Sequence, residues 1–350
     1  MQEMTASPPP LAVTSGDPAG IGFELALRAW QLRQMTDIPP FALFADATAT
    51  QQRARHLGLD VPCRSVPSLS AAGHLFATAL PIIDVPQAQP ATPGVPDARN
   101  GAAVMGSIER AVAGVLAGEA GAVVTNPIAK NVLYAAGFAH PGHTEFLAEL
   151  AGRAWPGRAF KPVMMLACDE LRVVPLTIHV ALAAVPGLLS QALIIETVRI
   201  TQRALIEDFA VSQPRIAVAG LNPHAGEGGT IGMEDETIVR PAVEALRHDG
   251  FAVTGPHSAD TLFHAAARAT YDAVVAMYHD QALIPIKTLA FDTGVNVTLG
   301  LPFVRTSPDH GTAFDIAALG VARPDSFIAA LKLARTTSRR RALAAAKPTP

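Results

Sequence analysis

Short apolar runs that end in polar residues recur along this chain, and helical patterns follow several of them. The clearest run, Asp272–Tyr278, is apolar and β-branched, and His279 follows it directly. Such a run is typical of a strand buried in a parallel sheet. A second run, Gly294–Gly300, alternates apolar and polar side chains with the period of two of a half-buried strand. We therefore expect Asn296 to face a cleft, and polar residues to gather at the strand ends.

The same alternation predicts the fold class. Further strands are expected from Leu11 and at 41–46, 80–85, 121–125, 163–167, 172–178 and 215–220, and helices from Phe23 and at 101–117 and 186–211. Because the order strand, loop and helix recurs, the pattern predicts an α/β protein whose sheets are mainly parallel and covered by helices on both faces. The stretch between His279 and Arg305 is interpreted as strand, loop and strand.

Length and composition narrow the class of protein. The chain has 350 residues and 36.5 kDa, which suits two domains of ordinary size. Hydrophobic residues make up 49% and charged residues 16%, so a globular protein is expected. The formal net charge of −3 gives no general attraction to nucleic acid or to anionic lipid, and no apolar run approaches the ~20 residues of a membrane span. A small-molecule partner is the default expectation.

Cysteine usage and the first residues indicate a compartment. Cys63 and Cys168 have neither the paired spacing nor the companions of a zinc cluster, and we interpret both as reduced, buried residues. The first ten residues are polar and rich in proline, without the basic and apolar regions of a secretory signal. The expected location is the cytoplasm.

Two loops are candidates for lining a ligand site, although the first could equally be a tight connection that touches no ligand. Ser15–Gly22 is a glycine-rich turn between a strand and a helix, but it matches neither the Rossmann fingerprint nor the P-loop. His143 and Thr144 precede an apolar helical pattern, with Thr144 as the expected N-cap, and a helix N-terminus there could bind a phosphate. The pattern equally allows that His143 lies beside the N-cap and binds no ligand. Lys130, after another strand, could lie in the same cleft or on the surface.

Three histidines, His179, His224 and His279, each lie just beyond an expected strand. Three neutral imidazoles can hold a divalent cation and leave positions open for a substrate, although a single histidine is more often an ordinary core or surface residue. Lys287 and Arg305 could bind two anionic groups of a substrate, such as a phosphate and a carboxylate.

The segment from His310 to Gly320 predicts a cofactor contact. Its sequence, HGTAFDIAALG, is similar to the HGSAPDIAGKG loop of the isopropylmalate and isocitrate dehydrogenases, which wraps the adenosine end of the nicotinamide cofactor. This similarity implies that His310, Gly311 and Asp315 bind NAD or NADP. Thr312 and Phe314 depart from the pattern.

These segments together resemble the family of 4-hydroxythreonine-4-phosphate dehydrogenases of pyridoxal 5′-phosphate biosynthesis, over about residues 11–334. The segments that carry the resemblance are SGDPAGIG, PGHTEFLAEL, MMLACDELRVV, GLNPHAGEGGTIGMED, ADTLF, AMYHDQALIPIK and FDTGVNVTLGLPFVRTSPDHGTAFDI. Departures are Phe23 after GIG, Asn126, and a short insertion rich in Arg, Trp and Pro between Leu150 and Lys161.

The resemblance implies an isocitrate/isopropylmalate dehydrogenase-like fold of two α/β/α domains, with a cleft and a homodimer. The first domain would comprise 11–140 and 292–334, the second 141–291, and 1–10 and 335–350 would be flexible tails. It also implies a set of site residues: His179, His224 and His279 for a divalent metal, one of them supplied across the dimer interface; His143, Thr144, Lys287, Asn296 and Arg305 for the substrate; and Lys287 and Asp260 as catalytic groups.

The implied reaction is the oxidation of 4-phosphooxy-L-threonine at C3 by NAD or NADP, assisted by zinc, cobalt or magnesium. The product, 2-amino-3-oxo-4-phosphooxybutanoate, would lose CO₂ to give 3-amino-2-oxopropyl phosphate. Dehydrogenases of 4-phospho-D-threonate or erythronate and a cis-diol dehydrogenase of aromatic dicarboxylates are the alternatives within the superfamily. A metal-dependent hydrolase and a non-catalytic phosphate-binding module are the alternatives from other classes.

Overall fold

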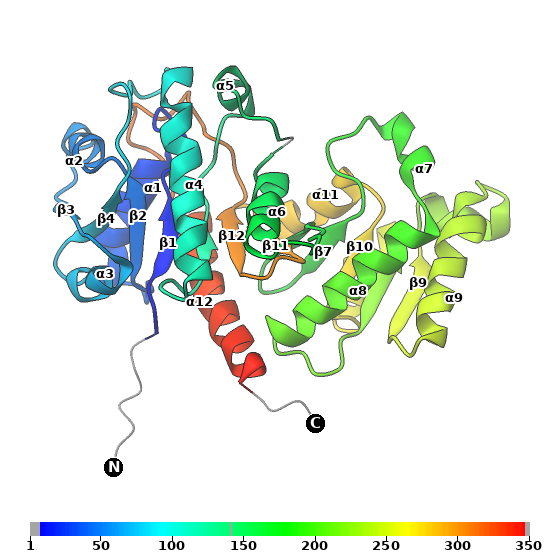
Figure 1. The fold of residues 1–350 in the computed structure, drawn as a ribbon. Coiled ribbons are helices and arrows are strands. Elements are labelled where there is room, and N and C mark those ends of the chain that lie inside the picture. The colour runs from blue at the N-terminus through cyan, green and yellow to red at the C-terminus, as the bar shows by residue number, and fades with distance from the viewer. Residues whose placement is uncertain (1–7, 141, 347–350) are drawn as a thin grey trace, which may run out of the picture. The chain divides into compact units, whose positions relative to one another are not determined.

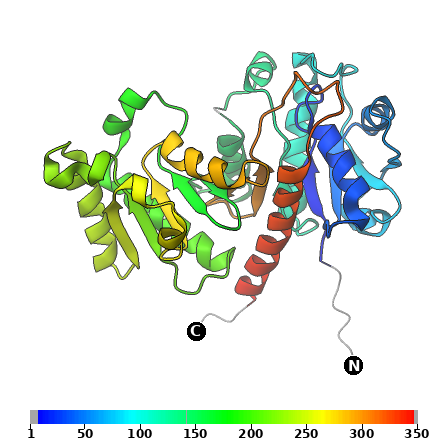
Figure 2. The ribbon, with the colours of Figure 1, turned by 180° about the vertical axis from the view of Figure 1, so that it is seen from behind.

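The protein is described by a computed structural model, in which residues 8–140 and 142–346 are placed. The chain divides into two compact units, 1–162 with 301–350 and 163–300. Each unit is a sheet with helices on its faces (Figures 1 and 2). The expected α/β class with mainly parallel sheets is confirmed. The boundaries between the units differ from the expected ones, which lay after residues 140 and 291.

The first unit is built on a parallel sheet in the order β3-β4-β2-β1-β5-β12. Its strands are β1 (Leu11–Thr14), β2 (Phe41–Ala45), β3 (Cys63–Ser65), β4 (Leu80–Asp84), β5 (Val123–Val124) and β12 (Arg305–Pro308). Its helices are α1 (Gly22–Gln31), α2 (Ala47–His56), α3 (Leu69–Leu75), α4 (Gly101–Leu116), α5 (Lys130–Ala135), α6 (His143–Ala154) and α12 (Asp325–Ala345), with 3₁₀ turns at Leu32–Gln34 and Ala98–Asn100. Helix α4 covers the face seen in Figure 1, and α1 and α12 cover the face seen in Figure 2.

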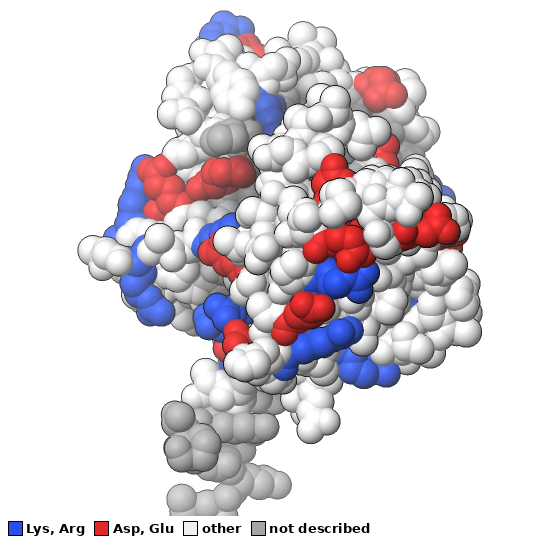
Figure 3. All heavy atoms as spheres, turned by 90° about the vertical axis from the view of Figure 1, so that its right-hand side faces the viewer, with Lys and Arg blue, Asp and Glu red and all other residues white. Residues whose placement is uncertain are grey.

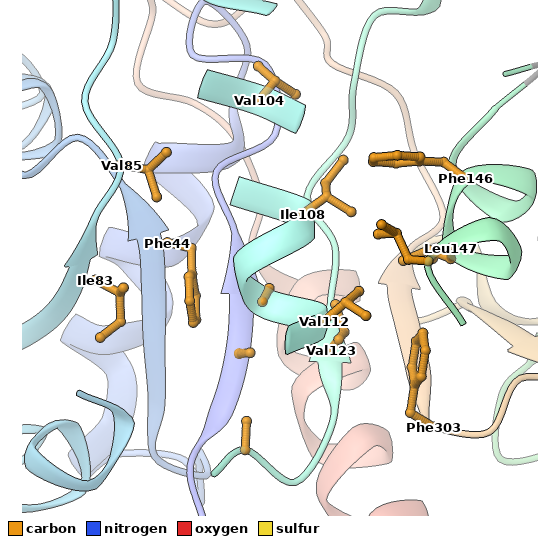
Figure 4. Close-up of a cluster of buried hydrophobic side chains, with 14 of the residues drawn as sticks. Phe44, Ile83, Val85, Val104, Ile108, Val112, Val123, Phe146, Leu147 and Phe303 are labelled. Atoms are coloured by element: carbon orange, nitrogen blue, oxygen red, sulfur yellow. The ribbon is translucent and has the colours of Figure 1, made fainter. Parts of the chain in front are cut away.

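A hydrophobic core lies between the sheet, α4 and α6 (Figure 4). Ile108 and Val112 of α4 point into it from one side, and Phe146 and Leu147 of α6 extend it. Phe146 also packs edge to face on Phe138, with ring centroids 5.2 Å apart. Because α6 buries its apolar face in this core, residues 143–154 belong to the first unit and not to the second, where the sequence prediction put them.

Helix α12 corrects the prediction of a flexible tail from residue 335. The helix runs without interruption to Ala345, and its buried residues Phe327, Leu331, Ala334 and Thr337 recur at helical spacing. The arginines at 339–341 therefore lie on a regular helix, and the Arg341 Nη1 donates a hydrogen bond to the Leu301 carbonyl at 3.2 Å. Residues 1–7 and 347–350, the remainder of the expected tails, lie outside the described residues.

The second unit is built on a mixed sheet in the order β11-β6-β7-β10-β8-β9. Its strands are β6 (Val163–Ala167), β7 (Arg172–Pro175), β8 (Ile216–Ala219), β9 (Val253–His257), β10 (Ala273–Ala276) and β11 (Val295–Leu299). Strand β6 pairs antiparallel with β7 and β11, and the other neighbours are parallel. The helices are α7 (Val185–Leu188), α8 (Gln191–Glu207), α9 (Arg240–His248), α10 (Ala265–Arg268) and α11 (His279–Ala290), with turns of 3₁₀ or π type at Leu182–Ala184, η4 (Pro223–Gly229), η5 (Asp235–Val239) and η6 (Ala259–Thr261). The pairing of β11 with β6, from Val295 on Ala167 to Leu299 on Val163, keeps this strand in the second unit.

Two helical segments of this unit differ from the sequence prediction. Residues 279–290, interpreted as part of a strand–loop–strand unit, form α11, because Ala282, Ile286 and Ala290 recur every four residues and are buried. The single helix expected at 186–211 is broken, since Leu189 is extended and the Ser190 hydroxyl accepts a hydrogen bond from the Leu193 N–H to start α8.

No single helix among residues 8–140 and 142–346 is long and apolar enough to cross a membrane; the segments 182–188 and 191–207 meet the criterion only together, bent by 90°.

The surface carries both signs of charge in close mixture. On the face shown in Figure 3, basic and acidic side chains lie interspersed between wide uncharged areas. In the second unit, Arg199 of α8 pairs with Asp249, which follows α9, and Arg240 of α9 pairs with Glu236 of η5, each at 2.7 Å. Cys63 and Cys168 are both free thiols, but only Cys63 is buried as expected, whereas Cys168 is half-buried. Burial raises the pKa of Cys63 to about 11.

Candidate functional site

The N-terminus of α6 in the first unit forms a candidate anion site. The helix begins at His143, and its N-cap Gly142 is extended and supplies no side-chain cap. Thr144 therefore lies in the first turn and is not the N-cap, contrary to the prediction. The Glu145 Oε2 and the Lys130 Nζ both approach this turn, 3.2 and 3.4 Å from the position that a Cβ on Gly142 would occupy. An uncapped helix start beside a lysine favours an anionic ligand.

His143 adds a neutral polar atom to this site. Its Nε2 is buried and has no hydrogen-bond partner among the described residues. Burial, and then the charges of Arg305 and Lys130, lower the pKa of His143 well below its usual value of 6.5. The imidazole is therefore uncharged at neutral pH, and its Nε2 can donate to or accept from a ligand.

Arg305 supplies a buried positive charge in the same unit. Only 5% of the residue is exposed, and its Nε and Nη2 donate to the Thr125 hydroxyl at 3.1 and 2.5 Å. Desolvation lowers the pKa of Arg305 to about 10, so the guanidinium stays charged at neutral pH. A fixed guanidinium of this kind suits a phosphate or carboxylate. Thr125, which holds Arg305, was not predicted as a site residue; its position at the end of β5 was the available signal.

The three predicted metal histidines follow neighbouring parallel strands of the second unit. His179 follows β7, His279 follows β10 and His224 follows β8, and β10 lies between the other two strands. The carboxyl ends of parallel strands meet at one edge of a sheet, which is where ligands bind in open α/β sheets. The sheet therefore brings these histidines to the same edge.

His179 and His279 share a cavity at this edge. Their ring centroids are 5.8 Å apart, and the cavity of about 310 Å³ is lined also by Thr177, Tyr278 and Asp280. The His279 Nδ1 lies 2.7 Å from an oxygen of Asp280. Because a carboxylate accepts, Nδ1 carries the proton, and Nε2 keeps the lone pair that a metal needs.

His224 does not join this pair within the chain. It lies in the η4 turn, outside the residues that line the cavity. The described part of the chain holds no cluster of three or more His, Cys, Asp or Glu side chains suited to a metal. Asp260 lies exposed on η6, which contacts η4. Within one chain, His179 and His279 therefore lie together, whereas His224 and Asp260 lie on two other elements that contact each other.

Lys287 and Asn296 also belong to the second unit. Lys287 lies in the last turn of α11, about 12 Å along the helix from His279 by the rise of 1.5 Å per residue. Its Nζ is 5.2 Å from the ring centroid of Phe291. Asn296 is half-buried on β11, opposite Leu166 of β6.

The predicted cofactor residues His310, Gly311 and Asp315 are exposed on a loop of the first unit. Backbone contacts hold this loop against the glycine-rich turn: the Ile21 N–H donates to the Thr312 carbonyl at 3.1 Å. Buried Arg53 donates to the carbonyls of Pro18, Gly20 and Ala317 at 2.9, 3.1 and 3.4 Å. Sequence reasoning missed Arg53, because nothing in its surroundings along the chain marks it.

Comparisons with known proteins find close relatives of this chain. The profile of the family described as pyridoxal phosphate biosynthetic protein PdxA matches residues 37–334. A 4-hydroxythreonine-4-phosphate dehydrogenase of Methylorubrum populi is 57% identical over 340 residues, 96% of this chain and 97% of the relative. One of Xanthobacter autotrophicus is 56% identical over 330 residues, 94% and 93% of the two chains.

Solved structures show the same likeness. The crystal structure of 4-hydroxythreonine-4-phosphate dehydrogenase from Klebsiella pneumoniae has a TM-score of 0.83 and 38% identity, covering 95% of this chain and 99% of that chain. A terephthalate 1,2-cis-dihydrodiol dehydrogenase from Burkholderia xenovorans has a TM-score of 0.62 and 31% identity, covering 94% and 98%.

Proposed function

This chain belongs to the PdxA family of pyridoxal phosphate biosynthetic proteins, and from that premise we propose how its residues perform the reaction. Its activity is that of a 4-hydroxythreonine-4-phosphate dehydrogenase, an oxidoreductase of pyridoxal phosphate biosynthesis. A dehydrogenase needs a nicotinamide cofactor, and the exposed His310, Gly311 and Asp315 would bind it as NAD or NADP. The location that fits this chemistry is the cytoplasm, in keeping with two free thiols.

The substrate, 4-phosphooxy-L-threonine, would bind through His143, Thr144, Lys287, Asn296 and Arg305. The uncapped start of α6, the orphaned Nε2 of His143 and the charge of Arg305 form a site that fits the phosphate or the carboxylate. The exposed Lys130 would add a second cation to the same end of the helix. The Lys287 ammonium would supply positive charge, and the Asp260 carboxylate would accept the proton of the C3 hydroxyl as hydride leaves for the cofactor.

The observation that carries the proposal is the pairing of His179 with His279 at adjacent strand ends, with Asp280 fixing one imidazole. This donor set fits zinc or cobalt when a third imidazole is added, and His224 would supply it, whereas magnesium prefers oxygen ligands. When bound, the divalent cation supplies positive charge beside the hydroxyl that is oxidised. Oxidation at C3 gives a β-keto acid, 2-amino-3-oxo-4-phosphooxybutanoate, and loss of CO₂ gives 3-amino-2-oxopropyl phosphate.

A homodimer would complete this site, because one chain does not bring His224 to the other two histidines. Exposed apolar side chains of the second unit support a partner surface there. They are Val180 at 42%, Leu182 at 67%, Leu188 at 48%, Ile284 at 64% and Phe291 at 72% exposure. Val180 and Leu182 line the same cavity as the histidine pair, so a second copy that covers them would bring its own residues to the site.

The test is NADH or NADPH formation by metal-replete protein on 4-phosphooxy-L-threonine, beside 4-phospho-D-threonate and a reaction without substrate. We expect turnover on the first, its loss on chelation, and its recovery with divalent metal. Turnover on the threonate alone would move the enzyme to sugar-acid phosphates and refute the substrate assignment. Absence of NAD(P)H formation on every substrate would favour a hydrolase or a binding module.

A separate variant tests the metal histidines. His224→Ala removes one imidazole from an exposed turn, so we expect metal affinity and kcat to fall while the secondary structure is kept. Full activity of this variant at low added metal would refute the three-histidine site.

A further inference from the structure

The turn that carries His224 has a backbone that side chains rarely adopt. From His224 to Gly229 the φ angles are +52°, +51°, +77°, +44°, +65° and +93°, so six successive residues are left-handed. His224, Ala225 and Glu227 are not glycines, and left-handed backbone is unfavourable for residues with a Cβ. The rest of the structure must therefore hold this turn in place.

A buried carboxylate holds the chain segment that enters this turn. Asp235, at the start of η5, is 0% exposed. Its Oδ1 accepts from the Leu221 N–H at 2.8 Å, and its Oδ2 accepts from the Asn222 N–H at 3.0 Å and from the Asn222 Nδ2 at 3.1 Å. The hydrogen bonds end two residues before His224, so Asp235 fixes the direction in which the chain enters the turn.

Close packing confines the turn from the other side. A Cβ on Gly220 would lie 2.9 Å from the Asp235 Oδ1 and 2.8 Å from the Cα of Ala225, and one on Gly226 would lie 3.3 Å from the Cβ of Asp235. The backbone can approach the carboxylate this closely only because both residues are glycines. The turn closes on itself through the Ile231 N–H, which donates to the Gly226 carbonyl at 3.1 Å.

Gln281 joins this turn to the strand end of His279. Its Nε2 donates to the Gly220 carbonyl at 2.8 Å, and its Oε1 accepts from the Met277 N–H at 2.7 Å. The segment that leads to His224 and the segment that leads to His279 are therefore fixed to each other. Asp235 and Gln281 act on the backbone of these segments and not on the imidazoles.

We propose that Asp235 is a positioning residue that holds the left-handed turn and so presents His224 to the divalent metal. The proposal rests on the assignment of His224 as a metal ligand in the proposed function. Asp235→Asn keeps the size of the side chain but turns one acceptor oxygen into an N–H donor that faces the N–H group of Leu221 or of Asn222. The segment that enters the turn would then lose a hydrogen bond that fixes its direction.

The experiment compares Asp235→Asn with Asp249→Asn, a matched aspartate on the surface that pairs with Arg199. Co²⁺ is titrated into each full-length apoprotein, and both the affinity and the visible absorption of the bound ion are recorded. We expect Asp235→Asn to bind Co²⁺ about ten- to hundredfold more weakly than the wild type, with an altered spectrum. At saturating Co²⁺ we expect a lower kcat with the KM for the cofactor unchanged. Asp249→Asn should match the wild type throughout.

Hydrogen exchange gives a readout that needs no metal. In the apoprotein of Asp235→Asn, the amides of residues 221–231 should exchange about tenfold faster than in the wild type, while β7 and β10 keep their protection. If Asp235→Asn folds poorly, Asn222→Ala removes the side-chain donor to Asp235 and Glu234, keeps the backbone donors to Asp235, and should shift both readouts in the same direction by a smaller amount.

The outcomes separate the positioning role of Asp235 from the assignment of His224 as a metal ligand. Wild-type Co²⁺ affinity and spectrum in Asp235→Asn, together with weak binding in His224→Ala, would overturn the positioning role and leave the three-histidine site standing. Wild-type affinity in His224→Ala would overturn the metal assignment, and the positioning role with it, even if the exchange of residues 221–231 is faster in Asp235→Asn.

Discussion

The burial of His143 predicts that acid destabilises the first unit through this residue. Burial and the neighbouring charges of Arg305 and Lys130 lower the pKa of His143 in the folded protein, while the unfolded chain titrates near 6.5. Above that pH both states are uncharged at His143, and the residue adds no pH dependence. As the pH falls below 6.5, the unfolded chain takes up a proton that the folded protein does not, so the free energy of unfolding decreases.

The size of the effect follows from linkage. At about pH 5.5, one unit below the unfolded pKa, the proton taken up by the unfolded chain lowers the free energy of unfolding by about 1.4 kcal/mol. At about pH 7.5 the same contribution is close to zero. Replacing His143 by Gln removes the titrating group, so the variant should lose about 1.4 kcal/mol less than the wild type between these two pH values.

The assay is urea unfolding followed by tryptophan fluorescence. Both tryptophans, Trp30 and Trp155, lie in the first unit, so the signal reports on the unit that contains His143. His257, whose pKa burial also lowers, is present in both proteins and cancels in the comparison. An equal loss of stability in wild type and His143→Gln between the two pH values would refute the argument.

Three further changes test other parts of the structure. Phe146→Ala removes a core side chain that is 3% exposed and should lower the free energy of unfolding by about 3–5 kcal/mol. Met35→Ala, at a residue that is 81% exposed, should lower it by under about 1 kcal/mol. Equal losses in urea unfolding would place α6 outside the core. Arg53→Gln should raise the KM for the nicotinamide cofactor about tenfold in steady-state kinetics and leave the KM for the substrate nearly unchanged, because it loosens the loop of His310, Gly311 and Asp315, which we propose binds the cofactor. An unchanged KM for the cofactor would exclude this loop from cofactor binding. His279→Ala should abolish most Co²⁺ binding by titration, and wild-type binding would exclude the histidine pair as the metal site.

Local patterns in the sequence determined the strands and where polar groups follow them. The alternation at 294–300 and the apolar run at 272–278 predicted β11 and β10, because a buried strand needs little more than its own periodicity to be recognised. The same patterns placed His179, His224 and His279 after strand ends. The pairing of His179 with His279 could not be predicted from spacing, since it depends on the strand order β7-β10-β8.

Several elements were decided by contacts far along the chain. Residues 279–290 contain Pro285 and resemble a strand locally, but burial of one face of α11 makes them helical. Helix α12 continues past residue 335 to Ala345, with Thr337 as its last buried residue and a hydrogen bond from Arg341 to the Leu301 carbonyl. The expected N-cap Thr144 lies in the first turn of α6 instead, and the actual N-cap, Gly142, is extended and supplies no side-chain cap.

The environment of each site residue is likewise a property of the tertiary structure. The sequence identified His143, Arg305 and His224 as residues of interest, because their types and neighbours match a known chemistry. It could not show that His143 is neutral, that Thr125 holds Arg305, or that Asp235 lies under a left-handed turn. Burial, charge and hydrogen bonding depend on residues brought together across more than ten positions of the chain, and only the folded arrangement of the sheets supplies those neighbours.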